Sequence, residues 1–417
     1  MLSRRHVLLP LGFAAACCAS SAAHAQPAAT APARVIRAQP RTSFTGASGD
    51  ASPSLLGYEG TVPGPVLRAR RGEELRVRLV NLLSEPTSIH WHGVRVPNAM
   101  DGVPGLTQAP VGPGASFEYV FRATEAGTFW YHASLPAHVG RGLYGALIIE
   151  EGETIDVDRD LLLVLGAPVE TQSQGRESVL VNGSRLPDIP VRAGERVRLR
   201  LINAGIQRGF SLKLAGLVPW VTAIDGQGVD PFLPHEGRIG VMPGGRIDVF
   251  ADMRSDTGAA LLLAGVRDEY PIARFVQDGA GVQLKSKRQP QPAPLPSNPL
   301  PARIDLKNAV KAELNLGDAV QGDLPRAPLF AVNRGRSVSL GIHNTGARPH
   351  VLHLHGHHFR LLDRLDDGWK PYWLDTLVVG EAVERIAFVA DNPGRWLIEC
   401  RMLERPEAGE AAWFAVT

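Results

Sequence analysis

Cysteine, methionine and long apolar runs are scarce in this sequence. Of its 417 residues, three are cysteine and five are methionine. Cys17 and Cys18 lie in a short apolar stretch near the N-terminus, and the remaining cysteine is Cys400. A disulfide framework needs pairs of cysteines, so the chain is not a small disulfide-stapled scaffold. Because the apolar stretch is too short to cross a bilayer, we also expect no membrane span in the mature chain.

Neither sign of charge prevails, because 44 lysines and arginines stand against 42 aspartates and glutamates, for a net charge of +2. This balance indicates neither a nucleic-acid partner nor an acidic substrate. Glycine and proline are frequent instead, at 44 and 33 residues. The apolar runs between them are short, which predicts many short β-strands joined by turns rather than long helices.

The first residues have the features of an export signal. Arg4 and Arg5 precede an apolar stretch that ends near Ala16, and Ala23-His24-Ala25 supplies small residues at a cleavage spacing. The sequence therefore predicts a twin-arginine-type signal peptide over residues 1–25 and a periplasmic or otherwise exported protein. The alternatives are a short membrane anchor and a lipid-modified cysteine. Removal of the signal leaves Cys400 as the one cysteine of the mature chain.

One pattern that begins with glycine and ends with asparagine occurs three times, at 72–81, 194–203 and 335–344. The residues between these ends alternate between polar and apolar, as in a half-buried strand. A second repeated unit follows each copy. In the first and third copies this unit continues to His132 and to Glu399, so these two residues occupy equivalent places in two copies of one domain.

The repeats predict an all-β chain of three tandem β-sandwich domains. We place domain 1 at residues 30–152, domain 2 at 153–288 and domain 3 at 302–417. The proline-rich stretch 289–301 is predicted to be an extended, semi-rigid linker before domain 3.

Two His-x-His pairs, His90 with His92 and His353 with His355, are candidate metal ligands. Residues two apart on a strand point to the same face, so each pair can present two imidazoles to one metal cluster. Imidazole suits copper, which has the highest affinity among the divalent first-row metals for such nitrogen sites. A glycine follows each pair, and two such segments indicate copper far more strongly than one.

With these motifs the chain resembles the multicopper oxidases, a laccase-like family of three cupredoxin domains. The resemblance covers nearly the whole mature chain. It rests on the following segments: His90-Trp91-His92-Gly93, Asp101-Gly102-Val103-Pro104, Thr107-Gln108, Trp130-Tyr131-His132, Gly142-Leu143-Tyr144-Gly145, residues 350–356, Asp375-Thr376, and Cys400 with Gly409. It implies three tandem cupredoxin-like Greek-key β-sandwich domains with copper as the cofactor.

In that family a type 1 copper takes electrons from a substrate and passes them through a cysteine to a trinuclear copper cluster, which reduces dioxygen to water. The resemblance implies that His90 and His353 correspond to ligands of the type 2 copper. It also implies that His92 and His132 correspond to ligands of one type 3 copper, and His355 to a ligand of the other.

Three positions of the cluster depart from the family pattern. Ser134 stands where the family has a second histidine after the Trp-Tyr-His segment. Glu399 and Arg401 flank the cysteine in place of two further histidines. Arginine has no lone pair to offer and stays cationic, so Arg401 cannot bind copper.

The type 1 position is also incomplete. His350 and Cys400 correspond to two of its ligands, but Arg405 replaces the second histidine and Glu410 stands at the axial position. A blue-copper site normally needs two histidines and a thiolate. The sequence therefore predicts that no working type 1 copper is held.

The charged residues that stand at these ligand positions have two interpretations. Glu399 and Arg401 lie on one face of their strand, which favours an ion pair in the vacated space, and Arg405 is predicted to pair with Glu410 similarly. In the alternative, Glu399 is an oxygen ligand of a smaller metal site with His355.

Three further histidines are predicted to lie outside the site. We expect His138 to be a solvated loop residue, with the alternative that it replaces the missing ligand at Ser134. We expect His357 and His358 to lie at a strand edge or on the surface.

Two classes of function follow. The first is an exported copper-dependent oxidase that takes electrons from a small molecule or a metal ion, with impaired turnover. Its variant is a protein that holds one type 2-like copper, by His90 and His353 with help from His92 and His132. The second class is a noncatalytic scaffold or binding protein of the same fold, similar to a cell-division protein, with a protein partner. Fold alone does not choose between these classes.

Overall fold

The computed structural model describes residues 32–41, 55–166, 179–253, 259–277, 291–317, 324–362, 371–381 and 383–417. The predicted signal peptide, with Cys17 and Cys18, lies outside these residues, as does the start of the predicted linker, 289–290. Within the described part of the chain, no helix has the length and apolar character needed to cross a bilayer. The predicted domain boundaries stay predictions.

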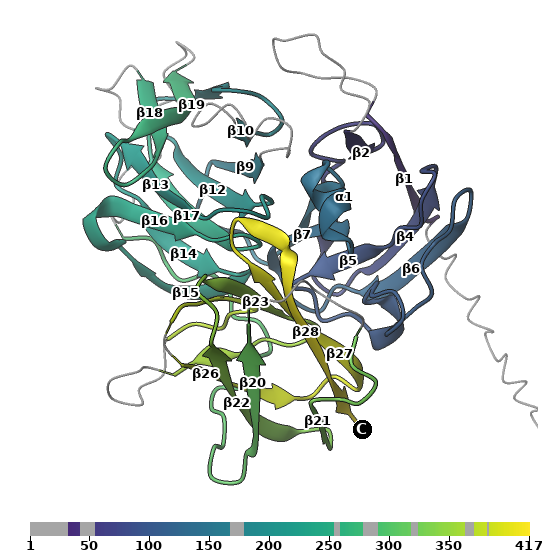
Figure 1. Ribbon diagram of the computed structural model, residues 1–417. Helices are drawn as coiled ribbons and strands as arrows, with labels where there is room; N and C mark the ends of the chain where they lie inside the picture. The colour runs from purple at the N-terminus through teal and green to yellow at the C-terminus, as the bar shows by residue number, and fades with distance from the viewer. Residues whose placement is uncertain are drawn as a thin grey trace, which may run out of the picture. The chain divides into compact units, whose positions relative to one another are not determined.

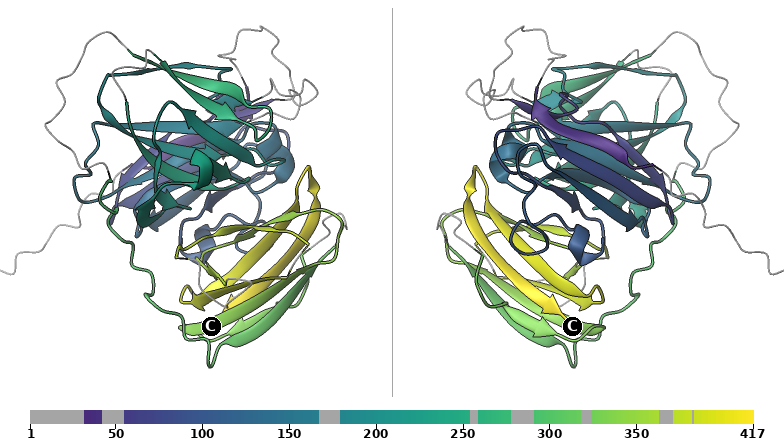
Figure 2. Two further views of the ribbon diagram at one scale, coloured as in Figure 1. Left: turned by 90° about the vertical axis from the view of Figure 1, so that its left-hand side faces the viewer. Right: turned by 90° about the vertical axis from the view of Figure 1, so that its right-hand side faces the viewer.

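The all-β prediction is confirmed, since strands arranged in layered sheets make up nearly all regular structure (Figures 1 and 2). The described helices are short: η1 (Asn98–Met100), α1 (Pro136–Gly140) and η3 (His235–Gly237).

The first sandwich consists of two four-stranded sheets, with strand orders β2-β1-β4-β6 and β3-β8-β7-β5. Both sheets contribute to one buried core, in which Val77, Trp91 and Phe129 have no exposed surface. Its strands are β1 (Arg34–Pro40), β2 (Leu56–Tyr58), β3 (Leu67–Arg70), β4 (Glu74–Asn81), β5 (Ile89–His92), β6 (Ser116–Arg122), β7 (Gly127–Ala133) and β8 (Tyr144–Glu150).

The second sandwich has sheets of order β10-β9-β12-β17-β14-β15 and β11-β19-β18-β13-β16, around its own core. Its strands are β9 (Arg159–Gly166), β10 (Leu180–Val181), β11 (Asp188–Val191), β12 (Arg196–Asn203), β13 (Phe210–Ala215), β14 (Trp220–Ile224), β15 (Gln227–Phe232), β16 (Arg238–Val241), β17 (Arg246–Asp252), β18 (Ala259–Ala264) and β19 (Tyr270–Gln277).

The third sandwich has sheets of order β20-β22-β26-β24 and β21-β28-β27-β23-β25, again around its own core. Its strands are β20 (Val310–Leu316), β21 (Phe330–Val332), β22 (Arg336–Asn344), β23 (His350–Leu354), β24 (Arg360–Leu361), β25 (Thr376–Val379), β26 (Glu384–Ala390), β27 (Gly394–Met402) and β28 (Arg405–Val416).

The repeated pattern forms the same strand in each sandwich, as β4, β12 and β22. Each of these strands pairs in parallel with the first strand of its sandwich and antiparallel with the strand of the second repeat, β6, β17 or β26. The asparagine that ends each copy of the pattern has the same role in all three sandwiches. The side-chain oxygens of Asn81, Asn203 and Asn344 accept a hydrogen bond from the backbone N–H two residues on, at 2.9, 3.0 and 3.0 Å. Such a bond turns the chain at the strand end.

The middle copy differs from the predicted half-buried alternation, because every residue of β12 is buried. Its polar face carries Arg196, Arg198 and Arg200, which pair with carboxylates; Arg198 Nη2 lies 2.6 Å from Asp248 Oδ2. Arg200 Nη1 also donates to Thr128 Oγ1 of β7 at 2.9 Å. The prediction that one face of β12 is exposed to solvent is therefore wrong. Its arginines are buried, and their contacts reach the first sandwich.

Candidate metal centre

Four strands bring the predicted site residues together. Strand β5 carries His90 and His92, and β7 carries His132 directly opposite His90. Strand β23 carries His353, which lies opposite Glu399 of β27 in the same register. The predicted equivalence of His132 and Glu399 is confirmed by this shared register.

The five predicted cluster histidines form one buried group between the first and third sandwiches. His90 Nε2 lies 3.1 Å from His353 Nε2, and His92 Nδ1 lies 3.3 Å from His132 Nε2. The rings of His92 and His353 stack with centroids 3.6 Å apart, and those of His90 and His355 lie 3.9 Å apart. All five residues are at most 5% exposed.

Backbone carbonyl groups set the protonation pattern of three of these rings. The Nδ1–H groups of His90 and His353 donate to the carbonyl oxygens of Asp101 (2.9 Å) and Asp375 (3.0 Å). His132 Nδ1–H donates to the carbonyl oxygen of Ala133 at 2.8 Å. A neutral imidazole has a single N–H, so Nε2 of each of these histidines carries a lone pair.

His92 has the opposite protonation pattern. Its Nε2 lies 3.0 Å from Thr376 Oγ1, and that hydroxyl donates to Asp375 Oδ1 at 2.8 Å. His92 therefore donates from Nε2, and its Nδ1 carries the lone pair. Lone pairs then face each other in two places, between His90 and His353 and between His92 and His132. Such pairs repel unless a cation lies between them, so this arrangement fits a metal ion.

Burial and neighbouring groups disfavour an extra proton on either ring of the second pair. Burial, followed by the nearby His353, holds the pKa of His92 well below its usual value. Burial, with His90 and Arg401 close by, does the same for His132. Both rings are neutral at ordinary pH.

Asp101 orients the fifth histidine. Its Oδ2 accepts a hydrogen bond from His355 Nδ1–H at 3.0 Å. Burial opposes the charge of Asp101, but His355 and His90 outweigh it and hold the pKa of this carboxyl far below its usual value. Burial lowers the pKa of His355 to about 4. His355 is therefore neutral, and its Nε2 has no hydrogen-bond partner among the described residues.

Sequence reasoning missed the group beneath the histidines. Arg246 of β17 has no exposed surface and donates to both carboxylate oxygens of Asp375, at 2.7 and 2.5 Å. It also donates to the carbonyl oxygen of Thr128 at 3.3 Å, so one side chain contacts all three sandwiches. Asp225 completes the group, and burial with the charge of Asp375 raises its pKa to about 7. The sequence contained one signal for this group, because Arg246 begins a strand, β17, whose other residues are mostly apolar.

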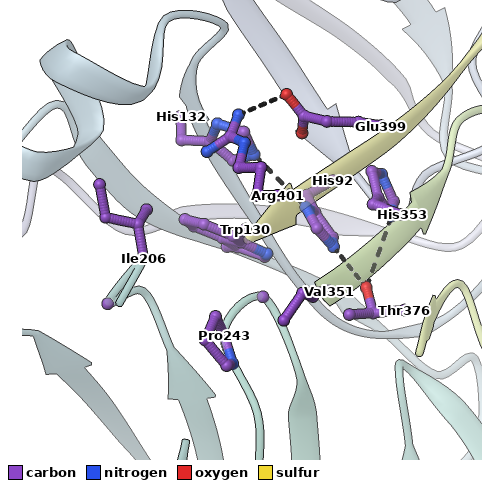
Figure 3. Close-up of a pocket in the computed structure, with 12 residues that line it drawn as sticks. His92, Trp130, His132, Ile206, Pro243, Val351, His353, Thr376, Glu399 and Arg401 are labelled. Carbon is purple, nitrogen blue, oxygen red and sulfur yellow. Dashed lines mark hydrogen bonds and ion pairs between the residues drawn. The ribbon is translucent and has the colours of Figure 1, made fainter. Parts of the chain in front are cut away.

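The predicted ion pair between Glu399 and Arg401 is confirmed, with Arg401 Nη2 2.6 Å from Glu399 Oε1. Figure 3 shows the two side chains directed toward each other beside His132. Burial alone would raise the pKa of Glu399, but Arg401 outweighs it and the pKa falls below its usual value. Glu399 is thus an anion already matched by a neighbouring cation.

Two cavities lie on either side of this ion pair, and His132, Glu399 and Arg401 line both. The smaller, shown in Figure 3, has a volume of about 40 Å³ and is bordered by His92 and His353. The larger has a volume of about 140 Å³ and is bordered by His90 and His355. Ser134 also lines the larger cavity, and its hydroxyl contacts Ser88 Oγ at 2.8 Å.

The type 1 position does not fit a blue copper. His350 is buried, and its Nε2–H donates to the carbonyl oxygen of Gly317 at 3.2 Å. Glu410 accepts from the N–H of the same glycine at 2.9 Å, and its predicted ion pair with Arg405 stays a prediction. Burial, with Glu399 and Glu410 nearby, raises the pKa of the Cys400 thiol well above its usual value. One imidazole and one thiol fall short of the two histidines and the thiolate that this copper needs.

The predictions for three other histidines are wrong, because all three are buried. His138 Nδ1 lies 3.1 Å from Thr87 Oγ1 and its Nε2 3.1 Å from Glu85 Oε1, so the ring does not take the place of the ligand lost at Ser134. His357 Nδ1–H donates to the carbonyl oxygen of His355 at 3.2 Å. His358 Nε2 accepts from Gln227 Nε2 of the second sandwich at 3.1 Å. Partners distant in sequence bury these rings, which local patterns do not reveal.

Family models described as multicopper oxidase match residues 43–154, 160–269 and 296–417. The multicopper oxidase MmcO of Mycobacterium tuberculosis is 29% identical over 428 residues, which cover 86% of this chain and 82% of that protein.

Solved structures agree in fold. The structure of Lac15 from a marine microbial metagenome is 35% identical, with a TM-score of 0.80, and the match covers 92% of this chain and 100% of that one. The multi-copper oxidase from Pseudomonas thermotolerans is 32% identical, with a TM-score of 0.78, and the match covers 93% and 99%. These matches span most of the chain and follow its three β-sandwiches in order, and they show that the chain belongs to the multicopper oxidase family.

Proposed function

We propose that this chain is an exported protein of the family that holds one copper at the histidine cluster and has impaired or absent oxidase turnover. Membership of the family implies copper as the cofactor and small-molecule substrates. The observation that carries the proposal is the approach of His90 Nε2 to His353 Nε2, 3.1 Å apart, while both Nδ1 atoms donate to carbonyl groups. Two lone pairs so close together favour a bound cation.

The proposed ligands of this type 2-like copper are His90 and His353, supported by His92 and His132. Copper bound there supplies one-electron redox chemistry. The chain itself buries the four imidazoles, and the carbonyl oxygens of Asp101 and Asp375 fix the orientation of two of them. Partners of this kind behind the ligands raise metal affinity by holding each ring in place.

The oxidase reaction of the family couples one-electron oxidation of a substrate to the reduction of dioxygen. It requires electrons to enter through the type 1 position, whose remaining residues do not fit a copper. Impaired turnover is therefore the expected consequence. If turnover persists, the electron donor is a small molecule or a metal ion that reaches the histidine cluster directly.

A noncatalytic scaffold of the same fold is the second candidate. The ion pair between Glu399 and Arg401 favours it, because the pair matches its own charges without a metal at the place of two lost histidines. In this case the function is to bind a protein partner.

Export through a twin-arginine signal at residues 1–25 belongs to the same proposal, together with domains at 30–152, 153–288 and 302–417. The arginine pair and the small residues before position 26 support the signal. Three buried cores support the division, and of these the first also takes in Val164, Ile202 and Ala204 of the second domain.

Titration of the purified protein with copper, followed by optical absorption and electron spin resonance, tests the copper proposal. We expect a type 2 resonance at one copper per chain and no strong blue band. His353→Ala is expected to abolish the resonance. His343→Ala is the matched control, because His343 is partly exposed and pairs with Glu313 away from the cluster.

A strong blue band with oxygen uptake in the presence of a laccase dye would show that the type 1 position works and would overturn the proposal. Absence of stoichiometric copper would overturn it in favour of the scaffold.

A further inference from the structure

A third cavity, which we call the junction cleft, lies where the first sandwich meets two connecting segments of the chain. Its volume is about 550 Å³, a size that is usual for small-molecule sites. One side belongs to the first sandwich and carries Arg71 and Arg122. The other sides are formed by residues 151–153, which lie between β8 and β9, and by Pro296 and Pro299, which precede the third sandwich. None of these residues belongs to the histidine cluster.

The two arginines of the junction cleft have no carboxylate partner. Arg71 Nη1 donates to the carbonyl oxygen of Ser297 at 3.4 Å, and Arg122 Nη1 donates to that of Gly72 at 3.0 Å. Neither arginine forms an ion pair with any residue that the structure describes. A guanidinium has five N–H donors in a planar fork that matches a carboxylate, so each of these side chains can still bind one.

Two glutamates line the same cleft, and they differ in how their charge is matched. The side chain of Glu151 is 7% exposed, and its Oε1 lies 2.8 Å from Arg198 Nη2, so its charge is neutralised within the protein. Glu153 is exposed and has no ion pair among the described residues. The junction cleft therefore presents two unmatched positive charges and one unmatched negative charge.

This set of charges restricts the ligand chemistry. The two arginines repel a simple cation. A dicarboxylate matches the arginines but leaves Glu153 facing a further anion. A molecule with two carboxylates and one ammonium group matches all three charges.

The prolines add an apolar wall to the junction cleft. Pro296 and Pro299 have no backbone N–H, so their rings offer a surface on which a short carbon chain can lie. We propose that the junction cleft binds an acidic amino acid, with its two carboxylates at Arg71 and Arg122 and its ammonium group at Glu153.

Calorimetric titration of the metal-free protein with L-glutamate at constant ionic strength tests this site. We expect saturable binding of one glutamate per chain. Glutarate lacks the ammonium group, and glutamine lacks the charge of the second carboxylate. Each is expected to bind roughly fivefold more weakly than glutamate, which is about the most that one exposed ion pair contributes.

Variants assign each charge of the ligand to its partner. Arg71→Gln and Arg122→Gln should each weaken glutamate binding roughly fivefold. Glu153→Gln should remove the preference for glutamate over glutarate, because the ammonium group loses its partner. Arg70→Gln is the matched control, since Arg70 is exposed and adjacent to Arg71 but does not line the cleft. All four positions are exposed, so we expect the variants to fold like the wild-type protein.

Absence of saturable glutamate binding by the wild-type protein overturns the proposal. Tighter binding of glutarate than of glutamate overturns it in favour of a plain dicarboxylate site, and equal affinity for the two removes the role of Glu153. A loss in Arg70→Gln as large as in Arg71→Gln would mean that glutamate responds only to overall charge, which also overturns it. Because all titrations use metal-free protein, failure here leaves the copper proposal untouched, and failure to bind copper leaves this site untouched.

Discussion

Glu399 and Arg401 carry two opposite charges that neutralise each other beside the histidine cluster. They lie two residues apart on β27, where side chains share a face, and their side chains are 13% and 12% exposed. The residue type alone prevents Arg401 from binding a metal, since a guanidinium has no lone pair to offer.

Removal of one charge from this pair should destabilise the protein. Glu399→Gln leaves the cation of Arg401 in a largely buried place, so we expect the free energy of unfolding to fall by about 3 kcal/mol. In the double variant Glu399→Gln/Arg401→Met no charge remains, and most of the stability should return. Urea denaturation of the metal-free proteins measures the free energy of unfolding of both variants. The interpretation fails if the double variant is as unstable as the single one.

Cys400 is expected to be unreactive in the folded protein. The side chain is 1% exposed, and burial raises the pKa of its thiol well above the usual value, so the nucleophilic thiolate is scarce. Iodoacetamide should label the peptide that contains Cys400 only after unfolding, which mass spectrometry of the digested protein detects. Rapid labelling of the native protein would contradict the burial and the assigned protonation.

The turns that follow the strands determine how the site is assembled. Gly93 comes directly after β5 with a φ of +81°, and a Cβ there would press against Arg246 Nη2 and lie 2.6 Å from Asp375 Oδ2. The glycine that follows the first His-x-His pair thus makes room for the ion pair beneath the histidines. The corresponding Gly356 after the second pair likewise makes room for the ring of Trp396.

Gly93→Ala should disturb that buried ion pair. A left-handed conformation costs alanine roughly 1–2 kcal/mol at any position, and displacement of Arg246 should add about 2 kcal/mol or more. Gly72→Ala is the matched control, because Gly72 has a φ of +89° and, among the described residues, no atom within 4 Å of a Cβ. Thermal and urea unfolding of the two variants compare the losses. Equal losses would mean that Arg246 moves aside easily.

Arg246 connects the three sandwiches at one point. Arg246 itself lies on β17 of the second sandwich. It donates to Asp375, which precedes β25 of the third sandwich, and to Thr128 on β7 of the first. The histidine cluster lies directly above, since Asp375 also accepts from His353 through its carbonyl group. The geometry of the site therefore depends on how the sandwiches are held together.

Arg246→Met should reduce the free energy of unfolding by about 3–5 kcal/mol, because it leaves Asp375 buried without its cation. Arg274→Met is the control, since Arg274 and Asp188 approach to the same 2.5 Å but are 47% and 56% exposed. An exposed pair contributes at most about 1 kcal/mol. Calorimetry should also show separate transitions in Arg246→Met, as the sandwiches lose their common contact. Similar stability losses in the two variants would contradict the role given to burial.

The three-fold repeat, the strand-rich fold and the five cluster histidines could all be read from the sequence. Alternation and spacing are local properties of the chain, and a strand pattern is the same wherever the strand lies. The departures from the family pattern at Glu399, Arg401 and Arg405 could also be read from the sequence, and the loss of copper ligands there stays a prediction.

Tertiary structure decided which groups are buried and what they face. His90 and His353 are separated by 263 positions in the chain, yet their nitrogens lie 3.1 Å apart. The burial of His138, His357 and His358 and the contacts of Arg246 depend on partners from other strands. Protonation and charge pairing follow from neighbours in space, and no local pattern encodes those neighbours.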